Sequence, residues 1–316
     1  MRISVLGATS QIAKDLVLSF AAQSDHELLL FARRPAAVTQ WLQAADLSGR
    51  YAVADFCAFG EGERFDIILN FVGAGNPAQI AALGASIFDV TLDYDRIALD
   101  YLRTNSRCRY VFLSSGAAYG ASFDQPADAS TAAVVPINSL QPQDWYAVAK
   151  LHAECRHRSL QHLQIIDVRV FNYFSHTLDM SSGSLMTDIV RAIRSQTLLQ
   201  TSRDYIVRDY VHPSDFYQLV DALLAAPPAN TAVDCYSKEP IDKPRILAAM
   251  QQKFGLHYAI GDHAGGPNPT GRKPHYYSLN RRAADFGYLP TLTSLQGLTM
   301  EMALLSRRPS LEGGQS

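Results

Sequence analysis

The chain has 316 residues, 47% of them apolar, and its 28 Lys and Arg against 30 Asp and Glu give a formal net charge of −2. This length and apolar content predict a large core, organised as one α/β unit with a smaller lobe. Because the charges are balanced and form no long run, neither a nucleic-acid-binding nor a membrane-binding surface is indicated.

The chain shows no pattern typical of secretion, membrane insertion or metal binding. A strand-like run begins at Ile3, so we expect no signal peptide, and no apolar run approaches the length of a membrane span. The nine histidines have no metal-ligand spacing with cysteine or carboxylate partners. We therefore expect a cytoplasmic protein without a metal site and with reduced, buried thiols, because its four cysteines lack paired spacing: Cys57, Cys108, Cys155 and Cys235.

The first half of the chain alternates apolar runs with helical patterns, which predicts a parallel sheet covered on both faces. The predicted strands are Ile3–Leu6, Leu28–Phe31, Tyr51–Ala54, Ile67–Phe71, Tyr110–Leu113 and Ile165–Val170. Two helices are predicted near 88–102 and 146–160. The fold class is thus a Rossmann-like, doubly wound α/β sheet with a smaller C-terminal substrate-binding lobe.

The alternation weakens after Val170, which indicates a change of domain. We expect residues 1–173 to form the nucleotide-binding domain, with 206–236 returning to it. Segments 174–205 and 237–307 form the predicted substrate-binding lobe, the latter being rich in Pro, Gly and His up to residue 290. Residues 308–316 are expected to be a disordered tail.

Small residues recur between the first strand and the first helix, in Gly7-Ala8-Thr9-Ser10-Gln11-Ile12-Ala13. The free amides at a helix N-terminus there suit a pyrophosphate, although tight packing explains small residues equally well. Ser10 and Ala13 replace the second and third glycines of the usual pattern, and the Ser10 hydroxyl can cap the helix or bond a phosphate. Predicted cofactor contacts in this turn are Gly7, Thr9, Ser10, Gln11 and Ile12.

The end of the second predicted strand favours NADP(H) over NAD(H), with NAD(H) still possible. Leu30-Phe31-Ala32 is followed by Arg33 and Arg34, with no carboxylate to accept from a ribose 2′-hydroxyl. A guanidinium matches a 2′-phosphate by charge and by its fork of donors, and the alternative is a solvated basic pair in a loop. Asp55, after the third strand, is a candidate for the adenine amino group or an ordinary turn aspartate.

Three residues form a candidate proton-transfer device: Ser115, Tyr146 and Lys150. The four-residue spacing of Tyr146 and Lys150 places phenol and ammonium on one helix face, where the cation favours the phenolate. Ser115 follows an apolar strand, so all three can meet at the carboxyl edge of the sheet. The remaining expected cofactor contacts also lie at strand ends: Phe56, Phe71, Val72, Ser114 and Val170.

In this combination the chain resembles the extended short-chain dehydrogenase/reductases, in their NAD(P)-dependent nucleotide-sugar epimerase, dehydratase and reductase branch. The resemblance rests on the motifs at 7–13, 113–120, 146–150, 169–172 and 208–215. It implies that Ser115 is catalytic and that Asn172 and Arg208 contact a substrate diphosphate. Ser115, Gly116 and Tyr146 are further expected substrate contacts, and a second cation can come from Arg272, Lys273 or Arg245.

The same resemblance narrows the choice among dehydration, reduction and epimerisation. The family's 4,6-dehydratases carry an Asp-Glu pair directly after the catalytic hydroxyl residue, whereas Gly116 and Ala117 follow Ser115 here. Because an epimerase usually uses NAD, Arg33 and Arg34 favour an NADPH-dependent reductase of a nucleotide-linked 4-keto-6-deoxy sugar. A nucleotide-sugar 4-epimerase and a non-catalytic NADP-binding protein of the same fold are the alternatives.

The resemblance also implies a homodimer, with the helices near 88–102 and 146–160 at its interface. Five apolar residues can line such a face or pack on the sheet instead: Ile97, Leu99, Tyr101, Leu151 and Leu160. Asp89 stands where the family often carries an asparagine of a proton relay.

Overall fold

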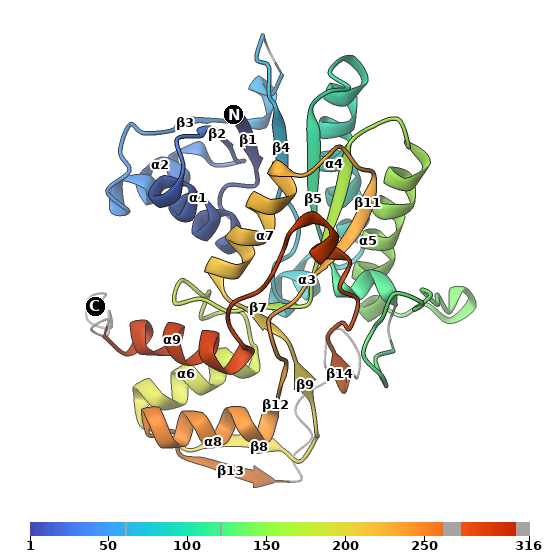
Figure 1. The fold of residues 1–316 in the computed structure, drawn as a ribbon. Helices are drawn as coiled ribbons and strands as arrows, with labels where there is room; N and C mark the ends of the chain where they lie inside the picture. Colours follow the sequence, from blue (N-terminus) through green and yellow to red (C-terminus); the bar gives the residue numbers. More distant parts are fainter. Residues whose placement is uncertain (61, 121, 262–272, 308–316) are drawn as a thin grey trace.

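The computed structural model describes residues 1–60, 62–120, 122–261 and 273–307 (Figure 1). Its centre is a seven-stranded sheet of order β11-β6-β5-β4-β1-β2-β3, in which every pairing is parallel. The strands are β1 (Arg2–Leu6), β2 (Glu27–Phe31), β3 (Ala52–Ala54), β4 (Ile67–Asn70), β5 (Arg109–Ser115), β6 (Ile165–Val170) and β11 (Thr231–Cys235). The predicted Rossmann-like α/β sheet is confirmed.

Helices cover both faces of this sheet because successive strand residues point to opposite sides. One face packs on α1 (Gln11–Gln23), α2 (Pro35–Ala44) and α7 (Pro213–Ala225). The other face packs on α4 (Ile87–Thr104) and α5 (Pro142–Ser159). Within β1, for example, Ile3 and Val5 join the first core cluster and Leu6 joins the second.

The structure corrects the predicted start of one helix and adds one strand that was not predicted. The helix carrying Tyr146 begins at Pro142, because proline suits the first helical position and the Gln141 backbone N–H donates to the Asp144 carboxylate at 2.9 Å. The seventh strand, β11, was not predicted as a strand. It contains the buried, charged Asp234, which interrupts its apolar pattern.

The C-terminal lobe has its own apolar core, formed by α6 (Leu185–Ser195), α8 (Lys243–Phe254) and α9 (Ser294–Arg307). These helices lie together at the foot of the molecule in Figure 1. Three small sheets accompany them: β7 (Asn172–Tyr173) with β10 (Tyr210–Val211), β8 (Leu199–Ser202) with β13 (Tyr258–Gly261), and β12 (Ile241–Asp242) with β9 (Val207–Arg208) and β14 (His275–Tyr276). The predicted tail at 308–316 lies outside the described residues.

The prediction of buried thiols is wrong for two of the four cysteines. Cys108 and Cys235 are buried, but Cys57 and Cys155 are exposed, and all four are free. Cys57 lies in a short 3₁₀ turn (Phe56–Ala58) beyond the sheet edge, whereas Cys155 lies on α5. Among the described residues, no helix is long and apolar enough to cross a membrane, and no group of three or more candidate ligands is placed to hold a metal ion.

Candidate active site

The predicted Ser-Tyr-Lys set meets at the carboxyl edge of the central sheet. Ser115 is the last residue of β5, and its Oγ accepts the backbone N–H of Ala117 at 3.2 Å. That bond starts the 3₁₀ turn Gly116–Tyr119, which redirects the chain and leaves the serine hydroxyl at the strand end. Ser115 as a whole is 6% exposed, so its hydroxyl lies in a largely desolvated environment.

Tyr146 lies in the second turn of α5 and is half-buried. Burial raises the pKa of its phenol, and a hydrogen bond from Ser115 acts in the opposite direction. The protein alone therefore keeps Tyr146 protonated at neutral pH, as a proton donor. The expected lowering of this pKa by Lys150 is not seen in the protein alone.

Lys150 is only 3% exposed, one helical turn beyond Tyr146. Its Nζ donates to the Leu113 carbonyl oxygen at 2.8 Å and lies 4.4 Å from the centre of the Phe112 ring. Burial lowers the pKa of Lys150 to about 8, although Glu154 opposes that shift. A lysine that is this buried, with no ion pair among the described residues, is typical of a functional site.

A buried ionic network supports the end of β5, where Ser115 lies. Ser114 Oγ donates to Glu154 Oε1 at 2.6 Å, and Arg169 of β6 binds both oxygens of the same carboxylate. Arg169 Nη1 lies 3.6 Å from Asp234 of β11. These contacts hold β5, β6, β11 and α5 in fixed register where Ser115 and Lys150 project.

The turn between β1 and α1 has the geometry expected at a nucleotide site. Gly7 has φ +80°, and a Cβ at this position would lie 2.9 Å from backbone atoms of Phe71 and Val72, so only glycine fits. Ser10 is the N-cap residue that precedes α1, and its side chain makes no capping hydrogen bond within the described residues, so its hydroxyl can bind a ligand. Gln11 is engaged already, because its Nε2 donates to Ser175 Oγ at 2.8 Å.

The other predicted cofactor residues differ in how accessible they are. Thr9 is exposed, and Ile12 and Val72 are partly buried. Phe71, Ser114 and Val170 are buried at the ends of β4, β5 and β6. All of them lie on the same carboxyl edge, as parallel pairing of the strands requires.

Two exposed arginines follow β2. Arg33 and Arg34 are exposed, and neither guanidinium pairs with any residue that the structure describes. Asp55 caps the next turn by accepting the backbone N–H groups of Cys57 at 2.8 Å and Ala58 at 3.4 Å, as an ordinary turn aspartate does. The neighbouring Phe56 packs edge-on against Tyr94 of α4 at 4.6 Å.

The predicted diphosphate residues gather above Ser115. Arg208 Nη1 donates to the carbonyl oxygens of Val207 at 2.8 Å and Lys273 at 2.7 Å, and burial lowers the pKa of this guanidinium. Lys273 is 6% exposed; burial and then Arg208 lower its pKa to about 8. Asn172 Nδ2 lies 3.4 Å from the Asp209 carbonyl oxygen. Two desolvated cations therefore share this region, which favours an anionic ligand.

The structure narrows the choice of a second cation. Arg245 is paired with Glu239 at 3.0 Å on the exposed start of α8, whereas Lys273 lies beside Arg208. Arg272 lies outside the described residues. Asp209 is structural, because its Oδ1 accepts from the Ser237 backbone N–H at 3.0 Å.

Two neighbours of Ser115 complete the centre, and one of them was missed in the sequence. Gly116 packs against Phe171, whose ring atoms would lie 2.4 Å from an added Cβ. Tyr276, which sequence reasoning did not single out, places its Oη 3.1 Å from Ser115 Oγ. Its only local signal is a Tyr-Tyr pair, at 276–277, inside the segment rich in Pro, Gly and His.

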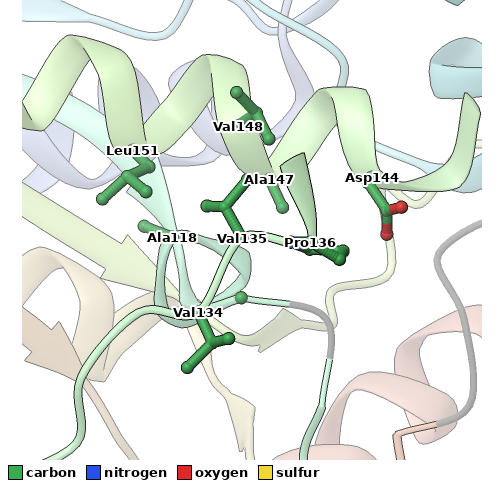
Figure 2. Close-up of a pocket in the computed structure, with 9 residues that line it drawn as sticks. Ala118, Val134, Val135, Pro136, Asp144, Ala147, Val148 and Leu151 are labelled. Carbon is green, nitrogen blue, oxygen red and sulfur yellow. The ribbon is translucent and has the colours of Figure 1, made fainter. Parts of the chain in front are cut away.

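A separate apolar pocket lies beside α5 and is not part of this candidate site. Figure 2 shows Val135 and Pro136 next to Ala147 of α5, with Leu151 one turn further along the helix. None of the three catalytic candidates lines it. The predicted interface residues Leu99 and Tyr101 are buried in the core between α4 and the sheet, so they follow the packing alternative.

The edge of the sheet as a whole fits a dinucleotide. The close approach at Gly7 and the uncapped N-terminus of α1 suit a pyrophosphate, and a Cβ at Gly73 would stand 3.5 Å from Lys150 Nζ. The side chains at positions 33 and 34, just beyond β2, are both cationic and exposed.

Comparisons with known proteins agree with this geometry. Residues 3–236 match the model of the NAD dependent epimerase/dehydratase family. No curated protein matches the chain.

Solved structures with the same fold include UDP-glucuronic acid 4-epimerase from Bacillus cereus, with a TM-score of 0.77 and 16% identity over 97% of this chain and 99% of that one. UDP-glucose 4-epimerase from Bifidobacterium longum has a TM-score of 0.78 and 16% identity over 98% and 99% of the two chains. For dTDP-glucose 4,6-dehydratase from Bacillus anthracis the TM-score is 0.74, with 14% identity over 97% of each chain. Because the family model spans most of its length, the chain belongs to the NAD dependent epimerase/dehydratase family and is an enzyme.

Proposed function

We propose that this enzyme is an NADPH-dependent reductase of a nucleotide-linked 4-keto-6-deoxy sugar. The observation that carries the proposal is the pair of exposed guanidinium groups at the end of β2, Arg33 and Arg34, which pair with none of the residues that the structure describes. A 2′-phosphate there gains charge-assisted hydrogen bonds of roughly 1.5–3 kcal/mol each. A reductase must exchange its spent cofactor, and cells commonly supply reducing power as NADPH.

Dehydration is disfavoured by the residues after Ser115. Gly116 and Ala117 are buried and carry no proton-transfer group, whereas dehydratases of this family place an acid and a base there. The tight contact of Gly116 with Phe171 leaves no room for a larger side chain.

The proposed mechanism assigns one task to each residue. A nicotinamide bound at this edge of the sheet would supply the hydride for the C4 carbonyl carbon. Tyr146 donates its proton to the developing alkoxide, which suits a phenol whose pKa is raised by burial. Ser115 hydrogen-bonds the same oxygen, and Lys150 would hold the nicotinamide ribose and provides positive charge beside Tyr146.

For the substrate we propose a nucleoside diphosphate sugar. Arg208 and Lys273 provide two cations with few competing carboxylates, and Asn172 adds a neutral donor. Binding of the diphosphate would offset the cost of burying both cations, because its negative charge pairs with Arg208 and Lys273.

A nucleotide-sugar 4-epimerase is the second candidate. It is favoured by the two structural relatives named as 4-epimerases, each solved in complex with NAD. The same Ser115, Tyr146 and Lys150 would serve that reaction, so the cofactor preference and the net redox change separate the two. A non-catalytic NADP-binding protein would show neither activity.

The test is oxidation of NADPH, with NADH in parallel, against nucleotide-linked 4-keto-6-deoxyhexoses that differ in base and sugar. We expect stoichiometric loss of NADPH with one member of the panel. Interconversion of 4-hydroxy sugars without net cofactor change would establish the epimerase instead.

Variants separate the two parts of the proposal. R33A/R34A should lower the preference for NADPH over NADH by about 10–100-fold, and an unchanged preference would contradict the assignment. Y146F should lower turnover by about 10²–10³ without loss of cofactor affinity, and full turnover would reject the mechanism.

We further propose a cytoplasmic homodimer that uses the outer faces of α4 and α5. Ile97 and Leu151 remain partly exposed there, whereas Leu160 follows α5 and packs against the core between α4 and the sheet. Light scattering of wild type and L151E tests this: we expect a dimer that the charge substitution dissociates.

A further inference from the structure

Besides Tyr146, the hydroxyl of Ser115 has two hydrogen-bond partners among the residues that the structure describes. One is the backbone N–H of Ala117 at 3.2 Å, and the other is Tyr276 Oη at 3.1 Å. Tyr276 lies 161 residues further along the chain, on β14, and reaches over the end of β5.

A serine hydroxyl has one proton and two acceptor lone pairs. Ala117 N–H can only donate, so it occupies one lone pair. A phenol is a stronger donor than an aliphatic alcohol, and the alcohol is the better acceptor, so the favoured arrangement has Tyr276 donating to Ser115. Both lone pairs are then occupied, and the single Ser115 proton is left to point toward Tyr146 and the reacting oxygen.

The surroundings of Tyr276 hold its ring in this position. Phe123 packs edge-on at 4.8 Å between ring centroids, and Phe171 lies at 5.1 Å. Lys273 Nζ lies 4.8 Å from the ring centre, and the backbone of Tyr276 pairs with Arg208 in the small sheet. Cationic charge over the ring withdraws electron density from the phenol and strengthens it as a donor.

The phenol of Tyr276 is also protonated at neutral pH. Burial raises the pKa of this phenol well above 10, so it keeps its proton throughout the physiological range. Tyr146 and Tyr276 therefore flank Ser115 as two protonated phenols in different environments.

We propose that Tyr276 is a positioning residue that donates a hydrogen bond to Ser115 and thereby directs the Ser115 proton toward Tyr146 and the substrate oxygen. The inference rests on the proposed function, because it assigns Tyr276 to the oxyanion contact of Ser115. Tyr276 thus adds a third hydroxyl group to those of Ser115 and Tyr146, and this group acts on the substrate only through Ser115.

A double-mutant cycle tests the proposal. Y276F should lower kcat about tenfold, the value of one hydrogen bond, with little change in KM. In an S115A background the same substitution should have no further effect. Y277F is the matched control: the ring of Tyr277 is adjacent but contacts His275 rather than Ser115, and turnover should be unchanged.

A second readout does not depend on turnover. Directing the Ser115 proton toward Tyr146 lowers the pKa of the Tyr146 phenol, so Y276F should raise it. The difference in tyrosinate absorbance between each protein and its Y146F counterpart isolates Tyr146 during an alkaline titration. Melting temperatures of Y276F and wild type establish that both are folded.

The outcomes separate this inference from the proposed function. If wild type reduces or epimerises no nucleotide sugar, the proposed function fails, while the Tyr146 titration still tests the hydrogen-bond arrangement. An equal loss from Y276F with or without Ser115 overturns the inference, because Tyr276 then acts independently. A faster Y276F enzyme also overturns it, since Tyr276 would then be accepting the Ser115 proton rather than directing it.

Discussion

Replacing His157 by glutamine should remove a large pH-dependent contribution to stability. His157 of α5 is fully buried, with Nδ1 2.6 Å from Asp167 Oδ1 and Nε2 2.8 Å from Asp95 Oδ1. Both ring nitrogens face carboxylates, so both must donate, and only imidazolium has two N–H donors. Arg156 and Arg158 also contact these carboxylates from the outside.

The magnitude follows from the shift in protonation. Burial alone lowers the pKa of His157, but Asp167 and Asp95 outweigh burial and raise it from 6.5 to about 9. That difference corresponds to about 3 kcal/mol of the free energy of unfolding. Because the pKa is higher in the folded state, this stabilisation is fully present below pH 6.5. It is lost as the pH rises through about 9.

The assay is urea unfolding of wild type and H157Q between pH 6 and 9.5, compared as the difference at each pH. Taking the difference removes contributions from Lys150 and Lys273, whose buried ammonium groups titrate near pH 8. We expect the gap between the two proteins to shrink by about 3 kcal/mol across the range. H162Q, at an exposed histidine on the same side of the domain, should leave the profile unchanged. Parallel profiles for wild type and H157Q would refute the assignment of a protonated bridge.

Three further predictions concern single side chains. K150M should raise the melting temperature at pH 7 while abolishing turnover, because burial holds the pKa of Lys150 at about 8 and its charged form destabilises the folded protein; calorimetry and kinetics together test this, and a less stable K150M would contradict it. Hydrogen bonds from two histidines lower the pKa of Glu301 to about 2 against burial, so its stabilisation is present above pH 4.5 and lost as the pH falls toward 2; an acid-unfolding curve of E301Q should be flatter over that range, and an unaltered curve would count against the contact. G116A should cost about 1–3 kcal/mol by pushing its Cβ into Phe171, whereas G75A, with no atom closer than 3.7 Å to the added Cβ, should cost little in the same denaturant titration; equal effects would mean that the Phe171 ring yields.

Local patterns were sufficient to predict the frame of the domain. Six apolar runs were identified as strands, because residues buried on both faces of a parallel sheet must be apolar almost without interruption. Tyr146 and Lys150 were recognisable for a similar reason, since a four-residue spacing on a helix fixes their relative position. Gly7 was recognisable because a close backbone approach at a strand-to-helix turn tolerates no side chain.

Contacts between distant segments were decided only by the tertiary structure. Asp234 broke the apolar pattern of β11, and its charge is compatible with burial only because Arg169, Tyr119 and Ser278 surround it. Tyr276 meets Ser115 across 161 residues, so no local periodicity could indicate the contact. The sequence by itself thus determined the sheet and the Ser-Tyr-Lys set, which depend on short-range spacing and burial. Which side chains close over that set depends on how the C-terminal lobe packs, because hydrogen bonding and desolvation at the sheet edge exist only once the two parts of the chain are brought together.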